Sequence, residues 1–252
     1  MRRIFSTINE KWIEYLLEVF VLIAGIYGAF ALESWGDREK DREQEQIVLE
    51  QLLQDYQTNK QQLSQKIEMR KEIIHSGYLL LTEIDNKGTY PYDSIIWALS
   101  TLTFDPTFDP VNNDLISSGN IQLISNPELA KMLSNWTSDI VAVQEFEQIW
   151  QDLSYNQLAE FYIKNKIARP TFHYIWSHME HLWLLDDVDH KPKQDILHVE
   201  LDVESIYQLH EIEGFASFAI GLNSAANDQS YALMRRIDKI IELLNQELDK
   251  NQ

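Results

Sequence analysis

Apolar side chains follow one another almost without interruption from Tyr15 to Leu32, and the only charged residue among them is Glu18. A helix that crosses a bilayer needs about 20 mostly apolar residues, whereas a buried helix of a soluble protein normally keeps a polar face. Trp12 and Trp35 flank the run, about 35 Å apart on a helix, which is close to the spacing of the two interfacial layers that Trp prefers. The pattern predicts a transmembrane helix over residues 12–35, with Trp12 and Trp35 as interfacial anchors.

Beyond residue 36 the pattern becomes amphipathic. Apolar residues return every three, four or seven positions between charged and amide side chains. This spacing predicts an amphipathic, coiled-coil-like helix up to about residue 85, continuous with the membrane helix or interrupted at Gly36 or Gly77. Asn59 and Arg70 are expected in its polar gaps. The expected apolar stripe consists of Leu49, Leu52, Tyr56, Leu63, Ile67, Ile74 and Tyr78.

The middle of the chain opens with turn signals. Gly and Pro within residues 85–92 predict a turn, and the apolar residues 94–102 predict a short helix. A tandem tetrapeptide, Thr-Phe-Asp-Pro, then occupies residues 103–110. Because each Pro pushes the preceding Asp out of the helical region, this segment is expected to be extended, and Asp105 and Asp109 are not expected to form a catalytic dyad.

A strong helix start follows. Either Ser125 caps the helix with Glu128 as its reciprocal partner, or Asn126 caps it with Pro127 at the first helical position. The helix is expected to reach about residue 166 and to be stopped by Arg169-Pro170. The residues expected to face a core are Leu133, Trp136, Ile140, Val143, Phe146, Trp150, Leu153 and Phe161.

Residues 171–200 differ in composition from the rest, because they hold five of the seven His residues together with Trp and Asp. Within them, residues 196–201 fit a weak strand or a short connection. The chain is expected to be helical again from Val203. A last helix over residues 227–250 shows heptad spacing at Met234, Ile237, Ile241, Leu244 and Leu248, which predicts a seam either within a bundle or between subunits.

These elements predict an all-α protein in which one transmembrane helix continues into a long amphipathic helix and then a helical bundle domain. The expected segments are a short basic N-terminus (1–11), a membrane helix (12–35), a rod helix (36–85), and a helical domain (86–252) with a His- and aromatic-rich insertion (171–200).

Charge and composition exclude several classes of function. The formal net charge of −19 disfavours binding to nucleic acids and to anionic lipid headgroups. The chain has no Cys, which excludes disulfides, thiolate catalysis and Cys-ligated metals. No phosphate-binding loop or nucleophile motif is present, so we expect neither enzymatic activity nor a cofactor.

A cleaved signal peptide would also begin with basic residues, here Arg2 and Arg3, but the apolar run is too long for one and contains a carboxylate. Lys and Arg are equally numerous close to both sides of the run, so they do not decide its orientation. The short basic N-terminus favours a cytoplasmic N-terminus and a translocated domain. We therefore expect a single-pass protein of the bacterial inner membrane with a periplasmic C-terminal domain.

One face of the membrane helix carries Glu18, Leu22, Gly25 and Ala29, at intervals of four, three and four residues. Gly25 and Ala29 are a small-xxx-small pair that lets two helices approach closely, which predicts a homo-oligomer. A carboxylate in a membrane helix suggests an ion or proton site by default. The simpler interpretation is that Glu18 only packs, or reaches the interface about 9 Å away.

His178 and His181 are three residues apart and could share a metal on a helix, which makes them candidate metal ligands. The spacing matches no metallohydrolase motif, and the neighbouring Trp and Tyr residues fit a packed aromatic corner equally well. The sequence therefore predicts no metal site, and a metal-dependent enzyme that uses the histidines of residues 173–198 remains an alternative.

Three stretches resemble a bacterial family, domain of unknown function 6090. The membrane segment matches the family's spacing at Glu18, Gly25, Ile26, Ala29 and Trp35. Phe104-Asp105 and the stretches Leu115–Asn120 and Leu123–Asn126 resemble its central signature, whereas Phe20, Ala24 and the His-rich segment depart from it. The resemblance implies a single-pass bacterial membrane protein and brings no activity or site residues.

The function that these features predict is a membrane-anchored scaffold or sensor module. Its expected partners are the lipid bilayer, further copies of the chain and an unidentified protein. An oligomeric ion or proton pathway lined by Glu18 is the alternative that the membrane segment leaves open.

Overall fold

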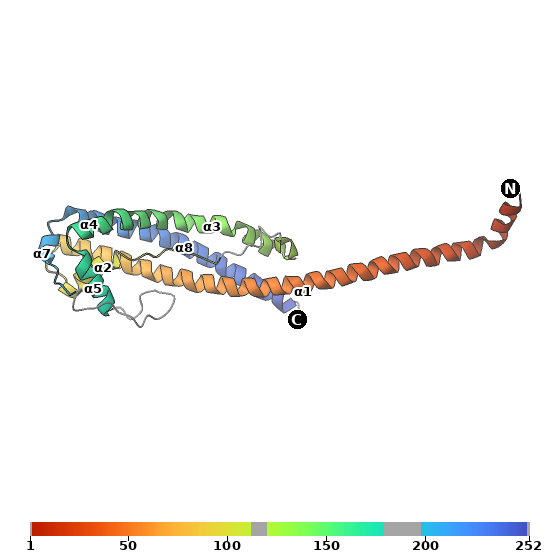
Figure 1. Cartoon of the computed structure of the whole chain (residues 1–252), viewed down its shortest axis with the longest axis horizontal. Helices are drawn as coiled ribbons and strands as arrows, with labels where there is room; N and C mark the ends of the chain where they lie inside the picture. Colours follow the sequence, from red (N-terminus) through yellow and green to blue (C-terminus); the bar gives the residue numbers. More distant parts are fainter. Residues whose placement is uncertain (1, 112–119, 179–197, 251–252) are drawn as a thin grey trace.

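The computed structural model describes residues 2–111, 120–178 and 198–250, and for residues 2–15 the backbone alone. Every regular element among them is helical, which confirms the all-α class (Figure 1). The two short elements η1 (Asn120–Leu123) and η2 (Ser154–Leu158) are a 3-10 turn and a π turn. The α-helices are α1 (Arg2–Asp85), α2 (Tyr92–Thr101), α3 (Pro127–Leu153), α4 (Ala159–Lys164), α5 (Ala168–His178), α7 (Val203–Ile206) and α8 (His210–Lys250).

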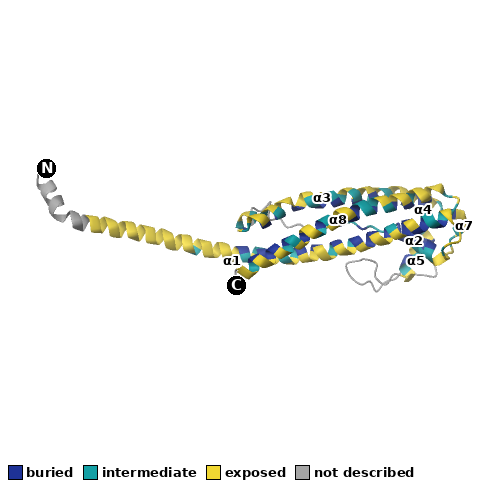
Figure 2. Cartoon of the chain, turned by 180° about the vertical axis from the view of Figure 1, so that it is seen from behind, coloured by how far each residue is buried: buried dark blue, intermediate teal, exposed yellow. Residues whose placement is uncertain are grey.

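Helix α1 is continuous over 84 residues, about 126 Å at the usual rise per residue. It contains an 18-residue window that is long and apolar enough to cross a membrane, and none of that window is buried (Figure 2). Neither Gly36 nor Gly77 interrupts the helix. At Gly77 the absence of a side chain serves packing, because a Cβ there would lie 2.7 Å from Ile220 Cγ1 and 2.9 Å from the carbonyl oxygen of Ala216 in α8.

The bundle consists of the second half of α1 together with α3 and α8. Contacts along the chain show that α1 and α3 run parallel, since Glu45 contacts Ser125, Tyr56 packs on Trp136, and Arg70 binds Glu147. Helix α8 runs antiparallel to both. It contacts α1 through Gly77–Ile220, Arg70–Asn227 and Lys60–Asp238. The short helices α2, α4, α5 and α7 gather at the end of the bundle farthest from the N-terminus (Figure 1).

Residues 45–85 of the predicted rod are therefore one wall of the bundle. The burial of Leu49, Leu52, Tyr56, Leu63 and Ile67 confirms the first part of the predicted stripe. The prediction is wrong beyond Arg70, where Tyr78 is 57% exposed and Ile73, rather than Ile74, is fully buried. The stripe shifts there because Ile73 and Leu80 join a different set of neighbours, which α2, α4 and α8 supply.

The N-terminus of α3 confirms one of the two predicted caps, the one at Asn126. The Asn126 side chain accepts hydrogen bonds from the backbone N–H groups of Glu128 (2.9 Å) and Leu129 (3.1 Å), and Pro127 occupies the first turn. Its predicted end near residue 166 is close to the observed end, but the predicted stop at Arg169-Pro170 is wrong. Helical structure ends at Lys164, and Pro170 lies in the first turn of α5, where a proline costs no intrahelical hydrogen bond.

The seam of the last helix is internal to the chain. Ile237 and Leu244 are fully buried, and Met234, Ile241 and Leu248 pack on the same core. The heptad pattern of α8 thus belongs to the bundle and not to a subunit interface within the described part of the chain. The helix is also longer than predicted, because it starts at His210.

Candidate functional site

The face of α1 that carries Glu18, Leu22, Gly25 and Ala29 is exposed along its whole length. Leu22 is 61% exposed, and no atom beyond the local helix lies within 4 Å of a Cβ placed on Gly25. Trp35 is also exposed, whereas the side chain of Trp12 lies outside the described residues. The face is free to meet lipid or another helix, and its role in a homo-oligomer stays a prediction.

The histidines gather differently from the predicted pair. His178 ends α5, where its ring stacks on Tyr174 with the centroids 4.1 Å apart and its Nδ1 lies 3.1 Å from the Tyr174 carbonyl oxygen. His181 lies outside the described residues, so the pair stays a prediction. The structure instead brings together His173 of α5 and His198, with ring centroids 4.9 Å apart and planes at 68°.

Burial lowers the pKa of His173, and the nearby rings of His198 and His178 lower it further. His173 therefore favours the neutral form near neutral pH. Within residues 2–111, 120–178 and 198–250, no group of three or more His, Asp or Glu side chains comes close enough to hold a metal ion. The described histidines thus offer two neighbouring imidazoles.

A buried ion pair crosses the middle of the bundle, and sequence reasoning missed it. Arg70 of α1 and Glu147 of α3 form a salt bridge with side chains 0% and 2% exposed. Arg70 also donates to Ser230 Oγ (2.9 Å), to Asn227 Oδ1 (3.3 Å) and to the Pro106 carbonyl oxygen (3.0 Å). Glu147 accepts a second hydrogen bond from the Phe108 backbone N–H at 3.1 Å.

Burial lowers the pKa of Arg70 to about 10, so the guanidinium remains charged at neutral pH. Its Nε atom is buried without a hydrogen-bond partner. A pair so deeply buried must be satisfied almost completely, because removing one partner strands the other charge in the core. The signal in the sequence was the position of each residue within an apolar stripe, Arg70 after Ile67 and Glu147 between Val143 and Trp150.

The tandem tetrapeptide lies along α1 as an extended strap, which we define as residues 103–111. Phe104 packs beside the core at the far end of the bundle, and Phe108 is fully buried in the core nearer the apolar N-terminal part of α1. The ion pair holds the strap between them. Farther along, Asn59 of α1 pairs with the backbone of Val111 through two hydrogen bonds of 2.7 and 3.2 Å.

Asp105 fixes the first copy of the repeat. Its carboxylate accepts from the hydroxyl and backbone N–H of Thr107, from Gln151 and from Tyr155. Burial alone would raise the pKa of Asp105, but these hydrogen bonds together lower it. Asp105 is therefore committed to holding the turn, and the expectation that it forms no catalytic dyad with Asp109 stays a prediction.

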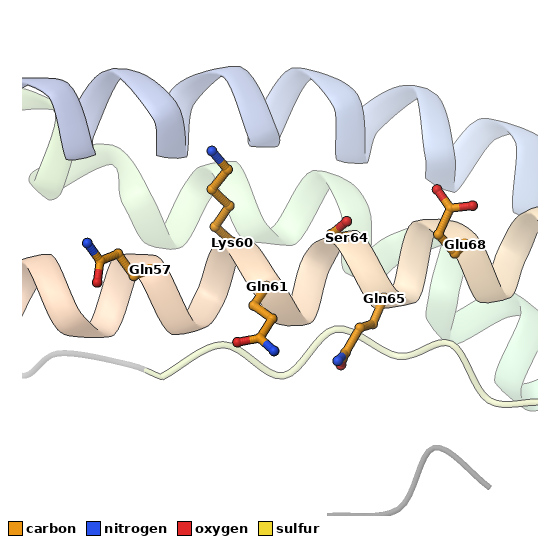
Figure 3. A pocket seen from close by; sticks show the side chains of 6 residues that line it. All are labelled: Gln57, Lys60, Gln61, Ser64, Gln65 and Glu68. Carbon is orange, nitrogen blue, oxygen red and sulfur yellow. The ribbon is translucent and has the colours of Figure 1, made fainter. Parts of the chain in front are cut away.

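A groove of about 450 Å³ runs along α1 beside the strap (Figure 3). Both charged side chains that line the groove are already paired. Lys60 points toward α8 and reaches Asp238 at 2.6 Å, and Glu68 binds Lys71 at 2.7 Å. The remaining lining side chains are amides and a hydroxyl, so the groove shows no acid–base or nucleophilic pair. Its lining residues are Gln57, Lys60, Gln61, Ser64, Gln65 and Glu68.

A search of family models, of curated proteins and of solved structures finds no match to this chain. The resemblance to domain of unknown function 6090 therefore stays a prediction, and the function has to be argued from the molecule's own geometry.

Proposed function

We propose that this protein is a single-pass membrane protein in which α1 crosses the bilayer and carries a rigid helical bundle that acts as a scaffold or sensor module. The observation that carries the proposal is the contrast within one unbroken helix. Its apolar stretch around Phe20, Ile26 and Phe30 is exposed, although α1 buries a full apolar stripe from Leu49 onward. Exposed apolar surface on this scale is stable in lipid and not in water.

The continuity of α1 supports a fixed spacing between the bundle and the proposed membrane segment. Between Leu32 and Glu45 the helix advances about 20 Å, and from Glu45 to Asp85 it advances about 60 Å more. Because α1 is continuous, a partner that tilts or rotates the far end moves the membrane segment as one body. This supports a role in holding or sensing a partner at a distance from the bilayer.

We propose the orientation expected from the basic N-terminus, with the N-terminus in the cytoplasm and the bundle in the periplasm. The chain contains no Cys, so single-Cys variants give an unambiguous test. A membrane-impermeant maleimide added to intact spheroplasts should label Ser134→Cys, on the exposed side of α3, and should label Ser6→Cys only after permeabilisation. The opposite labelling pattern would refute the orientation, and release of the protein by alkaline carbonate would refute the anchor.

We further propose that chains associate through the face of Glu18, Gly25 and Ala29. The support is its small residues and its exposure, because the heptad seam of α8 is used within the chain. Gly25→Leu should shift the protein toward monomer in nanodiscs, whereas Ala31→Leu, on the opposite side of the helix, is the matched control. An ion or proton pathway depends on this association, and unchanged flux through liposomes containing Glu18→Gln would remove it.

A further inference from the structure

We propose that His173 and His198 form a binding site for one divalent transition-metal ion of the zinc, nickel and copper class. The site lies at the end of the bundle opposite the membrane helix, and it differs from the His178–His181 pair that the sequence suggests. Two imidazoles come from elements separated by 25 positions in the chain, and their ring centroids lie 4.9 Å apart with the ring planes at 68°.

The distance fits shared coordination. Metal–nitrogen bonds of about 2.0–2.1 Å, plus about 1.1 Å from nitrogen to ring centre, place each ring centre about 3.2 Å from a common ion. Two such rings are about 4.5 Å apart when the angle at the metal is 90° and about 5.2 Å apart at the tetrahedral angle. The observed separation of 4.9 Å lies between these values, and the planes at 68° keep the rings from overlapping.

Both ligands are held by the fold. His173 lies in α5, which is fixed by buried Ile175 and by a hydrogen bond from Ser100 Oγ to the carbonyl oxygen of Thr171 at 3.3 Å. His198 is three residues from Leu201, whose backbone N–H donates to the Tyr92 hydroxyl at 3.0 Å. Anchors on both sides limit the motion of the rings, so little ordering is needed when a metal binds.

Neighbouring groups favour one hydrogen position on His173. The Ser177 hydroxyl donates to the His173 carbonyl oxygen at 2.7 Å, and so it can accept from the His173 Nε2, which lies 3.5 Å away. A hydrogen on Nε2 leaves the Nδ1 lone pair for a metal, an arrangement in which a neighbouring acceptor orients the ligand ring. Water completes the coordination shell, since the described residues supply two protein ligands.

The class of ion follows from the ligands. Imidazole nitrogen suits zinc, copper and nickel, whereas calcium and magnesium require oxygen ligands. The site is independent of membrane anchoring, so its failure in a binding assay leaves the proposed function standing.

The test uses the full-length protein in detergent after treatment with EDTA. Zn²⁺ binding is measured by calorimetry, and Cu²⁺ binding by electron paramagnetic resonance, which detects coordinated nitrogen directly. Because the chain has seven His residues, variants rather than binding alone decide the outcome. The variants are His173→Ala and His198→Ala, and the control is His75→Ala, which removes an exposed imidazole of α1.

We expect one ion per chain at this site, an affinity at least tenfold weaker in each site variant, and a change of less than twofold in the control. The copper spectrum should lose one of its two nitrogen couplings in either site variant. Circular dichroism checks that each variant is folded. The proposal is overturned if the wild-type protein shows no saturable binding, or if both site variants bind as tightly as the wild type.

Discussion

The bundle has two apolar cores of different construction, which meet at the Arg70–Glu147 pair. In the core nearer the apolar N-terminal part of α1, α1 and α8 face each other with large side chains such as Leu52, Leu63 and Ile237. In the far core the same two helices also meet through small residues, and large side chains of α2, α3 and α4 join Ile73 and Leu80 of α1 around them. The small residues are Gly77, Ala216 and Ala219.

Side-chain size at the contact sets the distance between two packed helices, so the small residues allow α1 and α8 to approach closely at Gly77. The space around that close contact is filled by Trp150, Tyr162 and Leu99, and the Tyr162 hydroxyl donates to the Leu99 carbonyl oxygen at 2.7 Å. The near core is thus an ordinary three-helix packing, whereas the far core depends on short helices folding around a tight pair. The two should respond differently to substitution.

The largest expected effect is at the boundary between the two cores. Arg70→Met leaves the Glu147 carboxylate buried without its cation, and we expect a loss of about 3–5 kcal/mol in the free energy of unfolding. Urea denaturation of the full chain in detergent, followed by circular dichroism, measures it. Arg70→Met combined with Glu147→Leu should recover much of the loss, because no buried charge remains.

The matched control is the exposed pair of Lys60 and Asp238, whose side chains are both 49% exposed. Lys60→Met should cost less than about 1 kcal/mol, because solvent screens this pair. If Arg70→Met and Lys60→Met lowered the free energy of unfolding equally, the buried pair would not join the two cores.

An intermediate effect is expected at Gly77, and it is confined to the far core. In Gly77→Ala the new Cβ would collide with Ile220 and with the backbone oxygen of Ala216, and the latter cannot turn away as a flexible side chain can. We expect a loss of about 1–3 kcal/mol by the same denaturation assay, together with faster hydrogen exchange in α2 and α4. Exchange in the near core should change much less.

Gly214→Ala is the control for Gly77→Ala. Gly214 also lies in a helix, but no atom beyond the local helix lies within 4 Å of a Cβ placed there. Replacing a helical glycine by alanine then stabilises the protein by up to about 1 kcal/mol, since alanine restricts the unfolded chain. A loss of stability in both variants would mean that the close approach of α1 and α8 is not what Gly77 provides.

The same division explains which features the sequence could predict. The near core follows large apolar residues at helical spacing, so Leu49, Leu133 and Leu244 could be assigned directly. In the far core Trp150 and Phe161 could also be assigned in this way, but the contact between α1 and α8 could not, because Ala216 and Ala219 carry little hydrophobic signal and Tyr78 of the expected stripe is exposed. Propensity and periodicity are local, whereas a close helix approach is a property of two distant segments.

The polar residues illustrate the same limit. A charged side chain is normally solvated. The sequence therefore predicts Arg70 in a polar gap, and it predicts Phe146, rather than its neighbour Glu147, in the core. Only the partnership of Arg70 and Glu147, 77 positions apart, makes their burial possible. His173 and His198 likewise become neighbours through folding, so a motif search that examines nearby histidines selects His178 and His181 instead.

The smallest expected effect concerns pH, and it compares a carboxylate at each end of the bundle. At the far end Glu83 accepts hydrogen bonds from the Tyr207 hydroxyl (2.6 Å) and from the backbone N–H groups of Gly88 (2.6 Å) and Tyr90 (2.8 Å). Burial raises the pKa of Glu83, but these hydrogen bonds together outweigh it and lower the pKa. At the near end, hydrogen bonds from Lys250 and then from Asn126 lower the pKa of Glu247.

A carboxylate whose pKa is lower in the folded state stabilises the protein above its unfolded pKa of about 4.3, and the contribution disappears as pH falls through the folded-state pKa. Stability should therefore decline on acidification below about pH 5, and Glu83→Gln and Glu247→Gln should each make that decline shallower. Hydrogen exchange then separates the two ends. Glu83→Gln should loosen residues 86–91 at neutral pH, whereas Glu247→Gln should loosen the start of α3, where Asn126 loses its partner. If each variant loosened both ends equally, the two cores would behave as one cooperative unit, and the boundary at Arg70 and Glu147 would not separate them.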